Sequence, residues 1–259
     1  MIKVLVNGAR GRMGTEVVRA VLAEDDLELV AAVDPAHAGE PMAEGSGLTV
    51  AGDLASAIAE ASPDVMVDFT HPSVVQAALE TALAAGVHCV VGTTGLPAET
   101  LERLASGARQ GACLFVAPNF AIGAVLMMRF AAIAARHMPH VEIIELHHDR
   151  KADAPSGTAL RTASLIAETR ASVPAVPGRE TEIAEGARGA LVDDVSIHSV
   201  RLPGLVAHQE VLFGGLGQTL SIRHDSIDRT SFMPGVILAV RETVKRSGLV
   251  VGLENYMEV

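Results

Sequence analysis

The first 118 residues alternate short runs of apolar, mostly β-branched residues with longer runs rich in Ala and Leu. The short runs are apolar at successive positions, which is typical of strands that are covered on both faces. They predict buried strands at Val4–Val6, Leu29–Val33, Val65–Phe69, Val87–Val91 and Leu114–Val116. The longer runs predict helices at Gly14–Ala23, Leu54–Ala61, Ser73–Ala85 and Ala98–Gln110. This alternation predicts an α/β fold with a Rossmann-like, doubly wound parallel sheet.

The rest of the chain has a different pattern. It predicts a long apolar helix at Gly123–Ala135, a strand at Val141–His147 and a helix that begins near Ser156. Residues 171–192 are rich in Pro, Gly, Arg and Glu, and we expect an exposed loop there. Turns that contain glycine separate three strand-like runs, which favours a meander in an antiparallel or mixed sheet; the runs lie near 195–201, 206–213 and 218–224. A last helix is expected at Pro234–Lys245.

These patterns predict two domains. The first is the α/β domain at residues 1–118, and the second is an α+β domain with a mixed sheet at residues 119–227. We expect the C-terminal segment, residues 228–259, to return and pack on the first domain.

Composition excludes several classes of protein. Hydrophobic residues make up 49% of the chain and charged residues 20%, which excludes a disordered polyelectrolyte. The net charge of −11 argues against a nucleic-acid partner. Cys89 and Cys113 lie in apolar runs, so we expect reduced, buried thiols. The chain starts without a signal-peptide pattern and its long uncharged stretches contain helix breakers, so we expect a cytoplasmic protein with no membrane partner.

A glycine-rich loop follows the first predicted strand and precedes the first predicted helix. Its sequence is Gly8-Ala9-Arg10-Gly11-Arg12-Met13-Gly14. Glycines in this position let the backbone approach a pyrophosphate, which the start of the helix then stabilises. About 20 residues further on, Asp34 ends the second predicted strand, where a carboxylate accepts hydrogen bonds from the adenosine ribose. A tight structural turn with a solvated Asp34 is the alternative.

The same loop bears on the choice of cofactor. A carboxylate at Asp34 favours NAD, because it repels a 2′-phosphate, whereas Arg10 or Arg12 would attract that phosphate. We therefore expect a dual or NAD-leaning nicotinamide dinucleotide site. Two further segments follow the fourth and fifth predicted strands, where ligands of such sheets bind: Gly92-Thr93-Thr94-Gly95 and Ala117-Pro118-Asn119-Phe120. On spacing alone, ordinary turns explain these two segments equally well.

A polar loop in the second domain is the densest group of reactive side chains. It contains His147, His148, Arg150 and Lys151, and the next helix opens with Ser156-Gly157-Thr158. Cations beside hydroxyl and amide donors at a helix start suit a small anion with carboxylates, and His or Lys can supply a proton. Adjacent histidines in extended chain point to opposite faces, so we expect no metal site, and no nucleophile turn surrounds Ser156. A solvated loop that caps a helix is the main alternative.

The order and content of these motifs resemble the 4-hydroxy-tetrahydrodipicolinate reductase family, also called dihydrodipicolinate reductase. The shared motifs are VNGARGRMG, VDFTHP, GVHCVVGTTG, APNFAIG, ELHHDRKADAPSGTA and RTSFMPGV. The resemblance implies reduction of a cyclic 4-hydroxy dicarboxylate, with loss of water, in lysine and diaminopimelate biosynthesis. It also implies a homotetramer joined through the sheets of the second domains, and closure of the domains around a small dicarboxylate substrate and NADH or NADPH.

By position in the family motif, His147 resembles the proton donor or acceptor and Lys151 the second proton donor. His148 resembles a contact to one substrate carboxylate, and Gly157 and Thr158 resemble donors to the other. The cofactor residues implied are those of the loops described above: Gly8 to Met13, Asp34, Gly92 to Thr94 and Ala117 to Phe120.

The sequence departs from the family pattern at two places. Pro35 replaces an arginine that grips the 2′-phosphate in many members, which leaves Arg12 as the expected phosphate contact. Ala207-His208-Gln209 stands where other members often carry Gly-Glu-His, and we expect it to lie outside the site. Two other functions stay open: a Rossmann oxidoreductase of another small amino-acid-derived carboxylate, and a non-catalytic dinucleotide sensor.

Overall fold

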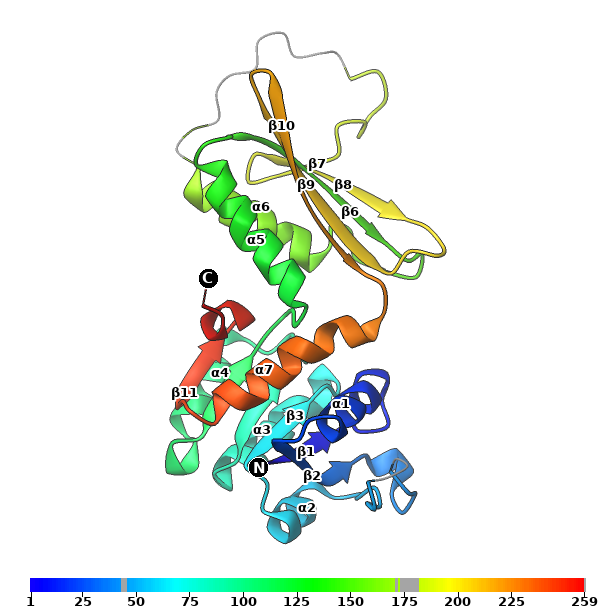
Figure 1. The fold of residues 1–259 in the computed structure, drawn as a ribbon, viewed down its shortest axis with the longest axis vertical. Coiled ribbons are helices and arrows are strands. Elements are labelled where there is room, and N and C mark those ends of the chain that lie inside the picture. Colours follow the sequence, from blue (N-terminus) through cyan, green and yellow to red (C-terminus); the bar gives the residue numbers. More distant parts are fainter. Residues whose placement is uncertain (43–45, 171, 173–181, 259) are drawn as a thin grey trace. The chain divides into compact units, whose positions relative to one another are not determined.

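A computed structural model of the chain describes residues 1–42, 46–170, 172 and 182–258. These residues form two compact units, one made of Met1–Ile122 with Phe232–Val259 and the other of Gly123–Ser231. The C-terminal helix and strand, orange and red in Figure 1, thus belong to the first unit. The sequence places the same two junctions a few residues earlier, after 118 and after 227.

The first unit is built on a six-stranded sheet in the order β11-β5-β4-β3-β1-β2. All its pairs are parallel. The strands are β1 (Ile2–Asn7), β2 (Leu27–Val33), β3 (Val65–Asp68), β4 (His88–Val91), β5 (Cys113–Val116) and β11 (Gly248–Val251). The strand order reverses between β1 and β3, which is the switch point at which ligands bind in doubly wound sheets. The predicted Rossmann-like sheet is confirmed, and its sixth strand, β11, was not predicted.

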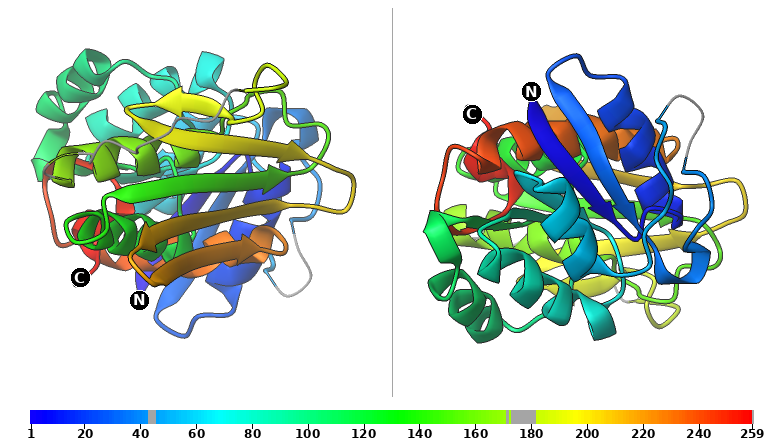
Figure 2. Two further views of the ribbon diagram at one scale, coloured as in Figure 1. Left: turned by 90° about the horizontal axis from the view of Figure 1, so that it is seen from above. Right: turned by 90° about the horizontal axis from the view of Figure 1, so that it is seen from below.

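Helices cover both faces of this sheet (Figure 2, right). They are α1 (Arg12–Leu22), α2 (Leu54–Ala61), α3 (Pro72–Ala84), α4 (Ala98–Ser106) and α7 (Met233–Thr243), with short 3-10 turns at Pro35–His37, Arg109–Gly111, Arg229–Phe232 and Leu253–Tyr256. Side chains of α2, α3 and α4 pack with one face of the strands in a single apolar cluster. Helices α1 and α7 contact each other, and α7 also contacts β4 and β5.

Local chemistry explains several helix limits. The carboxylate of Asp53 accepts the Ser56 amide at 2.8 Å and starts α2 at the predicted residue. The prediction for α4 runs too far, because the helix ends at Ser106 with Gly107 as its cap, and Gln110 has a positive φ of 57°. No helix in the described residues is long and apolar enough to cross a bilayer.

The second unit contains a five-stranded mixed sheet in the order β10-β9-β6-β8-β7 (Figure 2, left). Its strands are β6 (His140–His147), β7 (Ala190–Val192), β8 (Val195–Arg201), β9 (Ala207–Gly215) and β10 (Gln218–Ser226), and its helices are α5 (Ile122–Ala135) and α6 (Gly157–Thr169). The mixed sheet is confirmed. The predicted meander is wrong where it pairs β8 with β9, and correct where it pairs β9 with β10. Strand β6 lies between β8 and β9 and pairs parallel with the first and antiparallel with the second.

The predicted exposed loop at 171–192 falls partly on 171 and 173–181, which lie outside the described residues. Its end is a strand, β7, which pairs antiparallel with β8. In β6, odd-numbered residues from Val141 to Glu145 are buried and the even-numbered ones are half-buried, so one face of this strand is covered and the other is more open. Glu145 and His147 both lie on the odd-numbered face, near the end of the strand.

Candidate functional site

The glycine-rich loop turns directly after β1 and leads into α1. Gly8 has a positive φ of 75°, and its amide donates to the carbonyl of Val33 at 2.8 Å. A Cβ atom on Gly14 would lie 2.1 Å from the carbonyl oxygen of Gly8, so only glycine fits there. Gly11 caps the helix without a side chain, which leaves the first-turn amides of Arg12 and Met13 open to an anion.

Asp34 is tied to the glycine loop. Its Oδ2 accepts the Arg10 amide at 3.1 Å, while its Oδ1 accepts the Ala36 amide at 3.2 Å and lies 3.1 Å from Nδ1 of His37. The Arg10 guanidinium pairs with Glu40 at 2.8 Å. The charge of Arg10 is thus already matched by a carboxylate.

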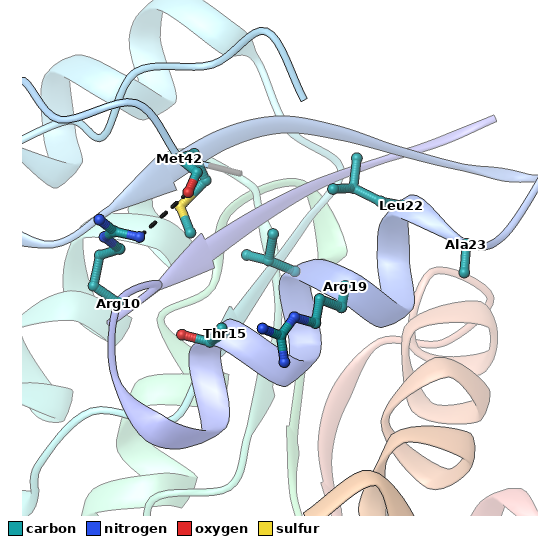
Figure 3. A pocket seen from close by; sticks show the side chains of 7 residues that line it. Arg10, Thr15, Arg19, Leu22, Ala23 and Met42 are labelled. Atoms are coloured by element: carbon teal, nitrogen blue, oxygen red, sulfur yellow. Dashed lines mark hydrogen bonds between the residues drawn. The ribbon is translucent and has the colours of Figure 1, made fainter. Parts of the chain in front are cut away.

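A surface pocket lies beside this loop. It has a volume of about 540 Å³ and is lined by Arg10, Thr15, Val18, Arg19, Leu22, Ala23 and Met42. Figure 3 shows Arg10 at its edge, where Nη1 donates to the carbonyl of Met42 at 3.4 Å. The side chain of Arg12 is exposed and makes no hydrogen bond or ion pair to the residues that the structure describes.

Asp68 at the end of β3 organises the switch point. Its carboxylate is fully buried and accepts hydrogen bonds from Asn7 Nδ2 at 2.7 Å, from Thr93 Oγ1 at 3.2 Å and from the amide and hydroxyl of Thr70 at 3.0 and 2.8 Å. A Cβ atom on Gly8 would lie 3.0 Å from Cγ2 of Thr70. The loops after β1, β3 and β4 are therefore held together by one side chain.

The other two predicted segments lie at the same edge of the sheet. Gly92 follows β4 and packs so closely on the ring of Phe69 that a Cβ atom would overlap it. Thr93 is buried, whereas Thr94 is exposed. After β5, Ala117 is buried, Pro118 is exposed, and Asn119 Oδ1 accepts the amide of Ala121 at 2.8 Å. Phe120 is buried, with its ring 5.4 Å from that of Phe69. The predicted cofactor residues thus lie in the loops that follow β1, β2, β4 and β5, or, for Arg12 and Met13, in the first turn of α1.

In the second unit, a buried ion pair lies behind His147. Nδ1 of His147 is 2.5 Å from Oε2 of Glu145, whose side chain is fully buried. Arg201, at the end of β8, donates to both carboxylate oxygens of Glu145 at 2.9 and 2.7 Å. Removing one partner of a buried pair costs about 3–5 kcal/mol, so these residues constrain each other strongly.

This arrangement sets the ionisation of the two residues. Burial by itself raises the pKa of Glu145, but hydrogen bonds from Arg201, Ser199 and His147 outweigh it and the net shift is downward, so the carboxylate is ionised at neutral pH. Burial lowers the pKa of His147, and Lys151 and Arg201 add to that shift, whereas Glu145 opposes it. His147 is therefore mainly neutral at pH 7.

The loop after β6 is held by the same ion pair. Arg201 Nη2 also donates to the carbonyl of Asp153 at 2.7 Å, and Nζ of Lys151 pairs with the Asp153 carboxylate at 2.8 and 2.9 Å. Lys151 is 22% exposed, so its ammonium group is near the surface. His148 has a buried Nδ1 with no hydrogen-bond partner in the described part of the chain.

Helix α6 starts at the end of this loop. Ser156 is buried, its Oγ caps the helix by accepting the Ala159 amide at 3.2 Å, and its own amide donates to Glu145 at 3.3 Å. Gly157 and Thr158 form the first turn, and a Cβ atom on Gly157 would meet nothing within 4 Å. The structure brings His147, His148, Lys151 and this helix start into one loop. Ser156 caps α6, as in the alternative interpretation of this loop, and its role in substrate binding stays a prediction.

Gln209 is far from Glu145 in sequence but stands next to it in the second sheet. It stands directly opposite Glu145 in the β6–β9 register, is buried, and donates to Thr162 Oγ1 at 2.7 Å. Its Oε1 has no hydrogen-bond partner in the described residues. Gln209 therefore stands beside Glu145 in the sheet, and the expectation that this departure from the family pattern lies outside the site stays a prediction.

Comparison with known proteins identifies the family. Residues 2–120 match the family described as "Dihydrodipicolinate reductase, N-terminus", and residues 123–257 match "Dihydrodipicolinate reductase, C-terminus". The chain belongs to the dihydrodipicolinate reductase family. It is 54% identical to the 4-hydroxy-tetrahydrodipicolinate reductase of Shouchella clausii and 52% identical to that of Mycolicibacterium vanbaalenii, with 100% of each chain covered.

Solved structures agree with this assignment. The dipicolinate-bound dihydrodipicolinate reductase from Paenisporosarcina sp. TG-14 has a TM-score of 0.88 and 46% identity, and the match covers 99% of this chain and 100% of that one. An amine dehydrogenase from Mycobacterium smegmatis, at 15% identity and a TM-score of 0.66 over 96% of this chain and 94% of that one, shares the fold. The resemblance seen in the sequence motifs is confirmed.

Three residues of this family member organise the loops but were not predicted as site residues: Asp68, Glu145 and Arg201. A signal existed for Asp68, because it is an acidic residue in the last positions of a strand that the sequence predicts to be buried, where ligands of such sheets bind. Glu145 and His147 are two residues apart on a predicted strand, and such residues share a face. Arg201 gave no signal, because its contact depends on the parallel register that places it opposite His147.

Proposed function

We propose that the protein reduces 4-hydroxy-tetrahydrodipicolinate to tetrahydrodipicolinate with NADH or NADPH. In this reaction the ring hydroxyl leaves as water, one hydride is added to the ring, and one proton is consumed. The observation that carries the proposal is the polar loop, where an imidazole backed by a buried carboxylate and an ammonium group precede the start of a helix. A dinucleotide sensor has no use for such a loop.

The first unit fits a nicotinamide dinucleotide. The open amides of the first turn of α1, the absence of a side chain at Gly11 and the close approach that Gly14 permits form a cradle for a pyrophosphate. Gly8, Ala9, Arg10, Gly11, Arg12 and Met13 would hold the phosphates, Asp34 the ribose, and the segments Gly92 to Thr94 and Ala117 to Phe120 the nicotinamide end. When bound, the cofactor supplies the hydride.

The second unit binds the substrate and moves the proton. The amides of Gly157 and Thr158 at the start of α6, next to the cap Ser156, hold one carboxylate, and His148 contacts the other. His147 and Lys151 provide the acid–base groups. Because a nearby dianion favours the protonated imidazole, substrate binding raises the low pKa of His147 toward the range needed for a proton donor.

We propose an NADH-leaning cofactor preference. Asp34 places a carboxylate where a 2′-phosphate would lie, and the guanidinium of Arg10 is paired with Glu40. Pro35 offers no cation, so Arg12 is the cation that stays available to a phosphate. Dual use with an NADH preference follows from one available arginine beside one repelling carboxylate.

The finer biological setting is also proposed. Family membership supports a role in lysine and diaminopimelate biosynthesis, a cytoplasmic location and a homotetramer joined through the second sheet. Analytical ultracentrifugation tests the tetramer: a sedimenting species of about four chain masses is expected, and a monomer would contradict it.

The activity is tested by adding the condensation product of pyruvate and aspartate semialdehyde to protein and NADH and following the absorbance of the reduced cofactor. Substrate-dependent oxidation is expected, with NADH used more efficiently than NADPH. If neither cofactor is oxidised, the reductase proposal fails. Tight dinucleotide binding without turnover would then favour a sensor, and turnover with a different amino-acid-derived carboxylate would favour another oxidoreductase.

A further inference from the structure

One buried ion pair ties together the whole length of the polar loop. The carboxylate of Glu145 contacts His147 at the start of the loop and the amide of Ser156 at its end, at 2.5 and 3.3 Å. Arg201 binds both oxygens of this carboxylate and donates to the carbonyl of Asp153 between them in sequence. The acid–base residue and the start of α6 are therefore positioned from a single point.

We propose that Glu145 is the positioning residue for the acid–base group: it orients the His147 ring and holds the ring proton on Nδ1, so that Nε2 exchanges a proton with the substrate. This inference rests on the proposed function, because it assigns a role in that reaction. An ionised carboxylate only accepts hydrogen bonds, so the nitrogen that faces it carries the hydrogen. Nε2 has no hydrogen-bond partner among the residues that the structure describes.

The charges around the ring predict what removal of Glu145 does. His147 is faced by Glu145 on its own strand, by Lys151 in the loop and by Arg201 on β8, and Lys151 in turn pairs with Asp153. Glu145 is the group that raises the pKa of His147, against burial and the two cations. Glu145→Gln removes this group and leaves the charge of Arg201 uncompensated, so the pKa of His147 falls and the protonated ring persists only at lower pH.

The same strand supplies a matched control. Glu142 pairs with His198 at 2.8 Å and with Arg188, which makes a second Glu–His–Arg cluster three residues away. Its side chain is 36% exposed, whereas that of Glu145 is fully buried, and it lies on the opposite face of β6. Glu142→Gln therefore removes the same charge and the same kinds of contact without touching the polar loop.

The first experiment measures kcat from pH 5 to pH 9 for the wild type, Glu145→Gln, Glu145→Asp and Glu142→Gln, together with the dissociation constant for NADH. General acid catalysis contributes a factor of roughly a hundred or more to turnover, and a badly positioned acid loses part of that factor. For Glu145→Gln we expect kcat at pH 7.5 to fall by about tenfold or more and the alkaline decline to begin at lower pH, with NADH binding unchanged. Glu145→Asp keeps the charge, so its kcat should lie between those of the wild type and Glu145→Gln. Glu142→Gln should have the wild-type kcat and pH profile. A folded Glu145→Gln protein with the wild-type kcat and pH profile would overturn the proposal.

A second measurement needs neither turnover nor a folded Glu145 variant. The ¹⁵N chemical shifts of the His147 ring are recorded in the ligand-free wild-type protein and assigned by their loss in His147→Gln. A neutral ring with its proton on Nδ1 supports the proposal, and a neutral ring with its proton on Nε2 overturns it. Because this result does not depend on substrate, an inactive wild-type enzyme would refute the reductase function without deciding the role of Glu145.

Discussion

Asp68 and Glu145 are both fully buried carboxylates at or near the end of a parallel-paired strand, one in each unit. The side-chain donors to Asp68 in the described residues are the amide of Asn7 and the hydroxyls of Thr70 and Thr93. Glu145 instead receives a guanidinium and lies against an imidazole. Each carboxylate gathers the loops around it, but with partners of different chemistry.

The difference separates two tasks. Asn and Thr side chains do not exchange protons near neutral pH, so the network around Asp68 fixes the loops proposed to hold the dinucleotide and does nothing more. Imidazole does exchange protons there, so the network around Glu145 also sets when His147 is charged. Variants of the first network should change stability and cofactor binding, and variants of the second should change turnover and its dependence on pH.

The largest effect is expected from His147→Gln. Loss of a general acid typically costs about a hundredfold or more in turnover, so kcat should fall by that factor while substrate and NADH affinities change little. Steady-state kinetics checks this, with His198→Gln as the control because His198 also pairs with a glutamate in the same sheet. Equal kcat values for the two variants would remove His147 from the acid–base role.

Lys151→Ala should reduce both substrate affinity and turnover. Charge-assisted hydrogen bonds are worth about 1.5–3 kcal/mol, which corresponds to about a tenfold to hundredfold loss in kcat/KM. The matched control is Lys245→Ala in the first unit, since Lys245 also pairs with a nearby carboxylate. Unchanged kinetics in Lys151→Ala would leave that lysine as a partner of Asp153 only.

Asp68→Asn tests the other side of the comparison. It places a donor where the carboxylate accepts hydrogen bonds, which should lower the free energy of unfolding by about 1–3 kcal/mol and weaken NADH binding. Urea unfolding and NADH titration measure both quantities. Asp64→Asn serves as the control, because Asp64 is exposed and its carboxylate accepts only the Lys3 amide in the described structure, at 2.8 Å. A shifted pH profile of kcat in Asp68→Asn would contradict the claim that only the network around Glu145 sets the ionisation of His147.

The smallest effect is expected from Glu40→Gln. Freeing the Arg10 guanidinium should improve NADPH binding relative to NADH by roughly threefold to tenfold at low salt, because the exposed charge is screened. Calorimetric titration with each cofactor measures the ratio. Glu28→Gln, at the far end of β2, controls for the change in net charge. An unchanged ratio would mean that Arg10 does not meet the 2′-phosphate.

Much of the first unit could be predicted from the sequence because its strands are uniformly apolar and its helices carry local start signals. Leu54–Ala61 is an example, since Asp53 supplies its own cap. Strand β11 was missed because three apolar residues after a helix and a glycine are ambiguous, and their pairing with β5 is a long-range contact. The pairing of β6 with both β8 and β9 was missed for the same reason, since turn residues give no information on sheet order.

The site followed a similar rule. Residues that act through local backbone, such as the glycine loop and the start of α6, could be located from motif and spacing. Residues that act across the sheet could not, because the register of β8 brings Arg201 to Glu145 and the register of β9 places Gln209 opposite it. The two glutamates of β6 also differ in burial: Glu142 is partly exposed and pairs with His198, whereas Glu145 is fully buried and contacts the imidazole of His147.

The most direct test is a crystal structure with NADH and pyridine-2,6-dicarboxylate, a planar dianion that does not react. We expect one carboxylate on the amides of Gly157 and Thr158, the other at His148, and Nε2 of His147 facing the ring, with the pyrophosphate on the first turn of α1. A dianion bound away from the polar loop, or a pyrophosphate away from the glycine loop, would contradict the assignment of these tasks to the two units.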